Sequence, residues 1–239
     1  MADLAGDARI LWRMLCGQPR SGSHAERLQA FYAPQADRYD TFRARLLHGR
    51  QRLIDQLNLQ PGERVVELGG GTGSSLARIG DRLPGLHRLQ LVDLCPALLA
   101  LAQARAQAHA NVEVIEADAT QWQPDQAVDV VFMSYALTMI PDWQAVLDNA
   151  HAMLRPGGRI GVVDFHLPAD ASRLSKIFWQ RWFAHDGVHL SDTHLPALSQ
   201  RFVEQHREQA HARLPYLPGL HAPYYLFIGG RAGQQPACL

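Results

Sequence analysis

The sequence predicts an α/β domain with a mostly parallel, seven-stranded sheet and helices on both faces. Three observations carry this prediction. Strand-like apolar runs alternate with helical segments between residues 63 and 165, an order typical of parallel sheets with crossover helices. A glycine-rich turn at residues 69–73 follows the first run. Near the C-terminus, two further runs flank a Pro/Gly turn at 217–220, which predicts an antiparallel C-terminal strand.

The elements follow from hydrophobic periodicity and from turn residues. Strands are expected over residues 63–68, 87–93, 111–118, 128–133, 159–165, 207–217 and 222–230. Helices are expected over residues 4–16 (weakly), 25–33, 36–57, 73–83, 96–109, 142–153, 171–184 and 194–206. Right-handed crossovers bring the carboxyl ends of the parallel strands to one sheet edge, where ligands bind.

Two units are predicted. Residues 1–58 form a helical segment that covers the ligand site, and residues 59–239 form one Rossmann-like domain.

Composition narrows the classes of function. The 239 residues are 47% hydrophobic with a formal net charge of zero, which disfavours nucleic-acid binding through bulk positive charge. The three cysteines have neither disulfide-framework nor metal spacing, so no metal is expected and a reducing cytoplasm is favoured. No apolar run approaches the roughly 20 residues that span a bilayer, and the N-terminus lacks the features of a signal peptide.

The turn after the first strand has the chemistry of a nucleotide loop. Gly69, Gly71 and Gly73 allow the backbone to approach a ligand closely. Asp93 ends the second strand, where a carboxylate can bind a ribose diol. Asp118 ends the third strand, where a side chain can meet the amino edge of adenine. Either acid could instead cap a helix or a turn, but both in register with the glycines favour a nucleotide site.

Strand-end Glu67, the GxGxG turn and the two later aspartates together resemble class I S-adenosylmethionine-dependent methyltransferases. The likeness spans about residues 60–165 and includes LRPGGRIGVVDF at 154–165. It implies S-adenosylmethionine as cofactor and a three-layer fold. The cofactor residues that it implies are Tyr39, Glu67, Gly69, Gly70, Gly71, Gly73, Asp93, Leu94, Asp118, Ala119, Ser134 and Tyr135.

The resemblance also implies individual roles for these residues. Glu67 and the glycines would line the methionine and ribose part of the cofactor, and Leu94 would flank adenine. Ser134 and Tyr135 would lie beside the reactive methyl. Tyr39 would cover the methionine end, although it could equally be a core aromatic.

Further stretches resemble the bacterial betaine-lipid methyltransferases, which methylate the amine of diacylglycerylhomoserine three times. These stretches are YAPQADRYDTFRARLLHGR (32–50), VDLCPALL (92–99), SYALTMIPDW (134–143), GVVDFHLP (161–168), FWQRWFAHDGVHL (178–190) and APYYLFIGG (222–230). Methyl transfer to an amine requires alignment of the reactants more than it requires a base. The lack of His and Lys in 134–143 fits this chemistry.

This resemblance suggests where the acceptor binds. Arg43 and Arg50, seven residues apart on the predicted 36–57 helix, could bind the substrate carboxylate or could simply be solvated. Aromatic faces stabilise a quaternary ammonium. The candidate acceptor residues are Tyr135, Trp143, Trp179 and Tyr224.

Tyr135, Tyr39 and His166 are the candidate catalytic residues, mainly for positioning. His48 and Asp164 are further candidates for holding a proton. The segment 173–183 combines aromatic and basic residues; it could contact a membrane surface, cover the acceptor pocket or pack on the sheet.

Other functions stay open at this stage. The alternatives are a methyltransferase for a soluble metabolite or a quinone, a non-catalytic cofactor-fold protein, and a nicotinamide-dependent oxidoreductase. The sequence leaves the acceptor, the number of methyl transfers and the oligomeric state undetermined.

Overall fold

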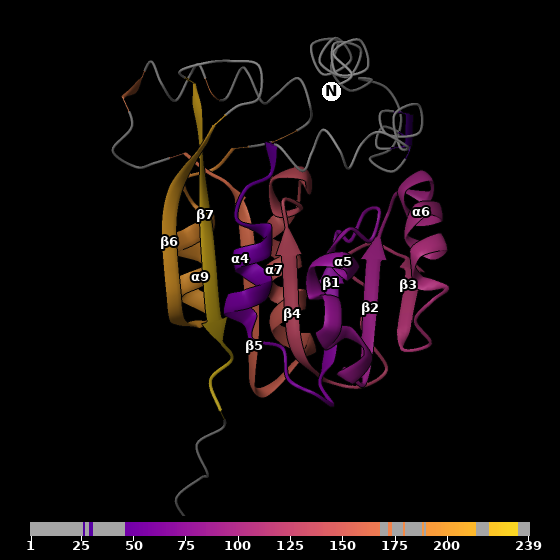
Figure 1. Cartoon of the computed structure of the whole chain (residues 1–239). Helices are drawn as coiled ribbons and strands as arrows, with labels where there is room; N and C mark the ends of the chain where they lie inside the picture. The colour runs from indigo at the N-terminus through magenta and orange to yellow at the C-terminus, as the bar shows by residue number, and fades with distance from the viewer. Residues whose placement is uncertain are drawn as a thin grey trace, which may run out of the picture.

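Seven strands form a single sheet in the order β3-β2-β1-β4-β5-β7-β6 (Figure 1). The computed structural model describes residues 26, 29–30, 46–167, 172–173, 179, 188, 190–213 and 220–233. The strands are β1 (Arg64–Leu68), β2 (Arg88–Asp93), β3 (Val112–Glu116), β4 (Val128–Ser134), β5 (Leu154–Phe165), β6 (Val203–Arg213) and β7 (His221–Gly230). Strands β1 to β5 run parallel, and β7 pairs antiparallel with both β5 and β6. The predicted mixed sheet with an antiparallel C-terminal strand is confirmed.

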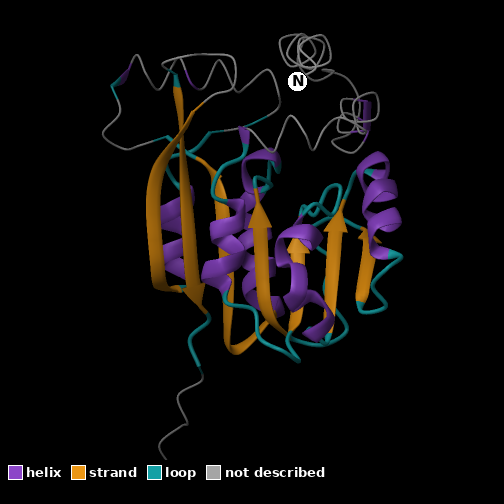
Figure 2. Cartoon of the chain, in the orientation of Figure 1, coloured by secondary structure: helices purple, strands orange, loops and turns teal. Residues whose placement is uncertain are grey.

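Helices cover both faces of the sheet (Figures 1 and 2). They are α4 (Arg50–Leu57), α5 (Ser75–Ile79), α6 (Pro96–Ala106), α7 (Trp143–Met153) and α9 (His194–Arg201), with 3-10 turns η2 (Gly80–Gly85) and η3 (Leu137–Met139). Apolar side chains of α4, α5 and α6 share one core cluster, and those of α7 and α9 share the other. The result is the three-layer architecture that an amphipathic α/β alternation produces.

Local signals explain where two helices begin and how a third packs. Pro96 stands at the first position of α6, where its missing N–H costs nothing. Asp142 caps α7 by accepting a hydrogen bond from the Ala145 N–H at 3.3 Å, as predicted. Gly161 of β5 lets α4 pack directly on the sheet, because a Cβ there would lie 2.9 Å from Leu53 Cδ1.

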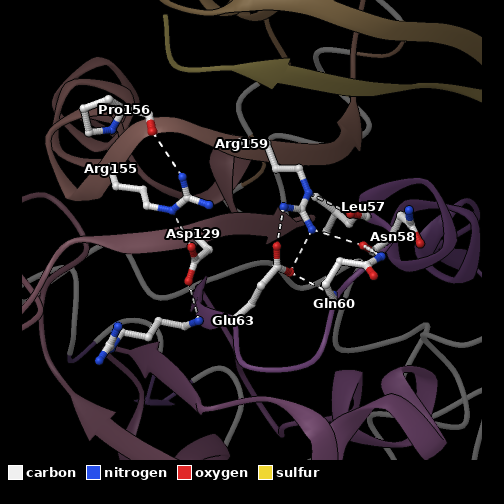
Figure 3. Close-up of polar contacts among 9 residues, drawn as sticks. Leu57, Asn58, Gln60, Glu63, Asp129, Arg155, Pro156 and Arg159 are labelled. Carbon is white, nitrogen blue, oxygen red and sulfur yellow. Dashed lines mark hydrogen bonds and ion pairs between the residues drawn. The ribbon is translucent and has the colours of Figure 1, made fainter. Parts of the chain in front are cut away.

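An ion-pair network holds α4 against the sheet at the edge away from the glycine loop (Figure 3). The Arg159 guanidinium on β5 donates to both carboxylate oxygens of Glu63, at 2.7 and 2.8 Å. Arg159 Nε also donates to the Leu57 carbonyl at 2.7 Å, and one Nη to the Asn58 carbonyl at 3.2 Å. Arg159 therefore satisfies the last carbonyls of α4, which the helix itself leaves without partners.

Three predicted helices differ from the structure. The helix expected over 36–57 is interrupted at residues 47–49, since Gly49 has φ +79° and precedes the start of α4. The helix expected over 73–83 ends at Ile79 and continues as η2, which contains Gly80 and Pro84.

The helix expected over 194–206 ends at Arg201, and Val203 already belongs to β6. Residues 203–206 were expected to be helical, yet their backbone pairs with β7 and extends the strand predicted from residue 207. Tertiary pairing overrides local preference here. Residues 4–16, most of 25–33 and most of 171–184 lie outside the described residues.

Candidate active site

A cavity of about 120 Å³, open to solvent, lies at the carboxyl ends of β1, β2 and β4. The turn between β1 and α5 forms its floor, and the beginnings of α4 and α6 flank it. Of the predicted cofactor residues, those that line the cavity are Glu67, Gly69, Gly70, Gly71, Asp93, Leu94, Asp118, Ala119, Ser134 and Tyr135. This is the sheet edge at which ligands bind in open α/β folds.

Gly73 does not line the cavity, although it belongs to the same turn. A Cβ on Gly73 would lie 3.2 Å from both Cα and Cβ of Ala102 on α6, and its φ is +71°. Gly73 therefore permits close packing of the turn on α6 and does not itself approach a ligand.

Glu67 is an acid in the cavity wall whose pKa is strongly shifted. The side chain is buried and accepts a hydrogen bond from the Ser75 hydroxyl. Burial raises the pKa of Glu67 to about 8, although the Ser75 hydrogen bond and the nearby Arg50 charge oppose the shift. A ligand ammonium beside Glu67 would stabilise its ionised form, so this end of the cavity suits the amino group of a methionine moiety.

Asp93 connects the glycine turn to the start of α6. One carboxylate oxygen accepts the Gly71 N–H at 2.8 Å, and the other accepts the Cys95 N–H at 2.9 Å. Burial raises the pKa of Asp93, although the backbone hydrogen bonds from Cys95 and Gly71 oppose the shift. The carboxylate is thus held in a fixed orientation in the cavity wall, as a ribose-binding acid requires.

Asp118 caps the turn after β3. Its Oδ1 accepts the Thr120 N–H at 2.8 Å and the Thr120 hydroxyl at 2.7 Å. Asp118 therefore caps a turn, which was the alternative to a ligand-binding role. Asp118 and Ala119 also line the cavity. The two roles are compatible, because a carboxylate has more than one acceptor site.

Tyr135 follows β4 in an uncommon backbone conformation, with φ +57°. Its hydroxyl donates to the His48 carbonyl at 2.7 Å, and its ring meets Phe165 edge-on at 4.6 Å between centroids. Burial raises the pKa of Tyr135 well above its usual value, so this phenol stays protonated at neutral pH. Tyr135 therefore holds the turn before α4 and has no spare proton donor for an acceptor.

Comparisons with known proteins place the chain among methyltransferases. The sequence pattern described as "Methyltransferase domain" matches residues 65–158. The demethylmenaquinone methyltransferase of Thermus thermophilus is 30% identical over 155 residues, which cover 61% of this chain and 70% of the relative. The chain belongs to the class I S-adenosylmethionine-dependent methyltransferases.

Other similar proteins span several acceptors. The trans-aconitate 2-methyltransferase of Escherichia coli is 33% identical over 110 residues, 46% of this chain and 42% of that protein. The N-methyltransferase NodS of Bradyrhizobium japonicum, solved with S-adenosyl-L-homocysteine, superposes with a TM-score of 0.66 at 16% identity, covering 85% of this chain and 98% of that one. The NodS similarity supports the fold, and the acceptor of this methyltransferase does not follow from either relative. The narrower betaine-lipid family predicted from the sequence is not shown by these comparisons.

Three predicted acceptor residues and the catalytic candidate His166 are not part of the cavity lining. Trp143 packs edge-on against His194, 4.6 Å between centroids, in the core on the α7 side of the sheet. His166 is buried, and its backbone N–H donates to the Pro223 carbonyl at 3.2 Å. Tyr224 packs beside Gly49, and Trp179 is buried in the core cluster that includes α4. Tyr135 belongs to one core cluster and Trp143 packs against the other, so the described structure does not bring these two rings together.

Arg50 lines the cavity beside the glycine turn, whereas it was predicted to bind the acceptor carboxylate together with Arg43. Its Nη1 donates to the Ser74 hydroxyl at 3.2 Å, and its charge acts on Glu67. The prediction of a carboxylate fork from Arg43 and Arg50 on one helix loses its basis, because the helix is broken between them. Tyr39 and Arg43 themselves lie outside the described residues.

Sequence reasoning missed Ser74, Ser75 and Arg78, which also line the cavity. The signal was available, since the serines directly follow the glycine turn and Arg78 lies one helical turn beyond. Within the described part of the chain, no helix is both long and apolar enough to cross a membrane.

Proposed function

We propose that this methyltransferase transfers methyl groups to the amine of an apolar acceptor, with diacylglycerylhomoserine as the substrate. One observation carries the proposal. The charged residues of the described cavity lining are Arg50, Glu67, Arg78, Asp93 and Asp118. The other lining residues are mostly apolar and include Leu47, Met139 and Ile140, which suits an apolar molecule.

The residues of the cavity would hold the cofactor in a defined direction. When bound, S-adenosylmethionine supplies a sulfonium methyl to the acceptor. Glu67 would accept hydrogen bonds from the methionine ammonium, and Arg50 would donate to the methionine carboxylate. Asp93 would bind the ribose hydroxyls, and Asp118 would accept from the adenine amino group.

An amine acceptor matches the chemistry of the wall around the methyl position. Methyl displacement onto a neutral amine requires alignment and no dedicated base. An α-amino group, with a reference pKa of about 8, has an appreciable neutral fraction at physiological pH. Leu47, Met139 and Ile140 carry no titratable group, so these residues can position an amine but cannot deprotonate a weaker acid.

A quinol ring carbon is the second candidate acceptor. The 30% identity to the Thermus demethylmenaquinone methyltransferase favours it, and a prenylated quinol would also fit an apolar wall. A quinol needs a base to remove its hydroxyl proton, which Leu47, Met139 and Ile140 cannot supply. A small soluble metabolite remains a third class, suggested by the trans-aconitate relative.

The test is methyl transfer from radiolabelled S-adenosylmethionine to three acceptors. These are diacylglycerylhomoserine in detergent micelles, chemically reduced demethylmenaquinone, and trans-aconitate. We expect label in the lipid. Label in the quinol alone would replace the proposal with the second candidate, and label in trans-aconitate alone would refute an apolar acceptor.

A matched pair of variants tests the apolar wall. Met139 is half-buried in the cavity lining, whereas Val203 on β6 is 61% exposed and remote in the fold. Met139→Lys should lower kcat/KM for the lipid by about tenfold or more, because it places a charge against an apolar acceptor. Val203→Lys should leave it unchanged, and equal effects of both would contradict the assignment.

A further inference from the structure

The segment that closes the cavity between β4 and α7 depends on a group outside the cavity. Residues 134–140, named the wall segment here, continue β4 through the 3-10 turn η3. Ser134, Tyr135, Ala136, Met139 and Ile140 line the cavity. The two remaining residues, Leu137 and Thr138, are buried and do not line the cavity. Whatever holds Leu137 and Thr138 therefore also sets the position of the lining residues.

Asp164 is the group that holds this buried side. It lies on β5, next to the strand from which the wall segment emerges, and is fully buried. Its Oδ1 accepts the Thr138 hydroxyl at 2.7 Å and the Phe165 N–H at 2.8 Å. Its Oδ2 accepts the Thr138 N–H at 3.0 Å. Two of these three hydrogen bonds thus join a buried carboxylate to a single residue of η3.

The charge on Asp164 strengthens this attachment. Burial raises the pKa of Asp164 to about 6, while the hydrogen bonds from Thr138 and Phe165 oppose the shift. The carboxylate is therefore mostly ionised at neutral pH. Hydrogen bonds to an ionised acceptor are roughly twice as strong as neutral ones.

The wall segment carries the position of η3 to the rest of the site. Ala136 packs directly against Gly69 of the glycine turn. The Tyr135 hydroxyl holds the His48 carbonyl in the turn before α4. A displacement of η3 would therefore move two cavity-lining residues relative to the cofactor loop.

We propose that Asp164 is a positioning residue for methyl transfer, because its hydrogen bonds to Thr138 fix the wall segment against the transferred methyl. The inference rests on the proposed function only in placing the sulfonium beside Ser134 and Tyr135; it is independent of the acceptor. Displacement reactions are sensitive to small errors in alignment. Asp164 acts through the wall and does not line the cavity itself.

Three substitutions separate this role from general stability. Thr138→Val removes one hydroxyl hydrogen bond at nearly constant volume, and Thr138→Ser retains the hydroxyl. Asp164→Asn keeps the shape but turns one acceptor into a donor. In either amide orientation, the new NH₂ faces a backbone N–H, of Thr138 or of Phe165. Asp164→Asn is therefore the stronger perturbation, and Thr138→Val is the milder variant that keeps the inference testable if Asp164→Asn fails to fold.

The experiment measures dissociation constants by calorimetry for three cofactor ligands. S-adenosylmethionine and sinefungin carry a group at the methyl position, and S-adenosylhomocysteine carries none. We expect Thr138→Val to weaken the first two about fivefold more than S-adenosylhomocysteine, the size of a lost interaction of about 1 kcal/mol. Thr138→Ser should restore wild-type ratios.

Equal weakening of all three ligands, or no change in any, would overturn the inference. The result does not depend on which acceptor is correct, so it fails separately from the proposed function. With whichever acceptor the three-acceptor assay identifies, Thr138→Val should also lower kcat about tenfold while the acceptor KM stays constant. A change confined to KM would contradict a positioning role.

Discussion

Replacing Gly69 with alanine should damage both the fold and the cofactor site. Gly69 has φ +74°, a left-handed conformation that alanine adopts at a cost of about 1–2 kcal/mol. A Cβ on Gly69 would also overlap the Cβ of Ala136 in the wall segment. Overpacking of this kind costs about 1–3 kcal/mol. Gly69→Ala should therefore lower the free energy of unfolding by about 2–5 kcal/mol.

Two further variants separate the backbone cost from the clash. Gly62 has φ +82°, and a Cβ on Gly62 would have no atom within 4 Å, so Gly62→Ala should show only the backbone cost of about 1–2 kcal/mol. Ala136→Gly removes the methyl that Gly69→Ala meets. The double variant should therefore recover the clash contribution, a favourable coupling of about 1–3 kcal/mol.

Urea unfolding of the four variants and the wild type, combined with S-adenosylhomocysteine titration, provides the measurement. We expect Gly69→Ala to weaken ligand binding and the double variant to regain most of it, because the glycine turn and the wall move apart when they clash. If Gly69→Ala costs no more than Gly62→Ala, or if Ala136→Gly fails to compensate, the close contact between turn and wall does not exist in solution.

Three further predictions concern charge. Burial lowers the pKa of His194 to about 4, so between pH 4 and 6.5 the unfolded chain binds a proton that the folded chain does not. The free energy of unfolding should therefore fall by about 3 kcal/mol as the pH drops through this window. In urea unfolding, His194→Gln should flatten that pH dependence. Asp93→Asn should raise the dissociation constant of S-adenosylhomocysteine at least about tenfold, because an amide cannot accept both backbone N–H groups and the ribose; Asp125→Asn, on a 67% exposed side chain, should not. Arg159→Met should lower the free energy of unfolding by about 1–3 kcal/mol, and adding Glu63→Gln should cost little more, because the pair is already broken; additive losses would contradict their coupling.

Part of the site could be predicted because its signals are local. The glycine turn directly follows a buried strand, and Asp93 and Asp118 each end or follow the next strands. Parallel connections then bring these residues to one edge without any knowledge of side-chain packing. Glu67, Gly71 and Asp93 accordingly line one cavity.

The acceptor side could not be predicted in the same way. Trp143 lies eight residues after Tyr135, and sequence proximity suggested a shared site. The strand and turn between them place the two rings in different core clusters. Arg50 was assigned by helical spacing to Arg43, but the break at Gly49 removes that relation and leaves Arg50 beside Ser74.

The sequence by itself determined the α/β alternation, the sheet edge that carries the cavity and the acids that line it, because periodicity and strand ends are properties of short stretches. Only the tertiary structure decided that Tyr135 holds the turn before α4 and that Asp164 anchors the wall segment. Those two hydrogen bonds join residues 87 and 26 positions apart. No local pattern specifies such partners, since they are selected by the way that α4 and β5 pack around β4.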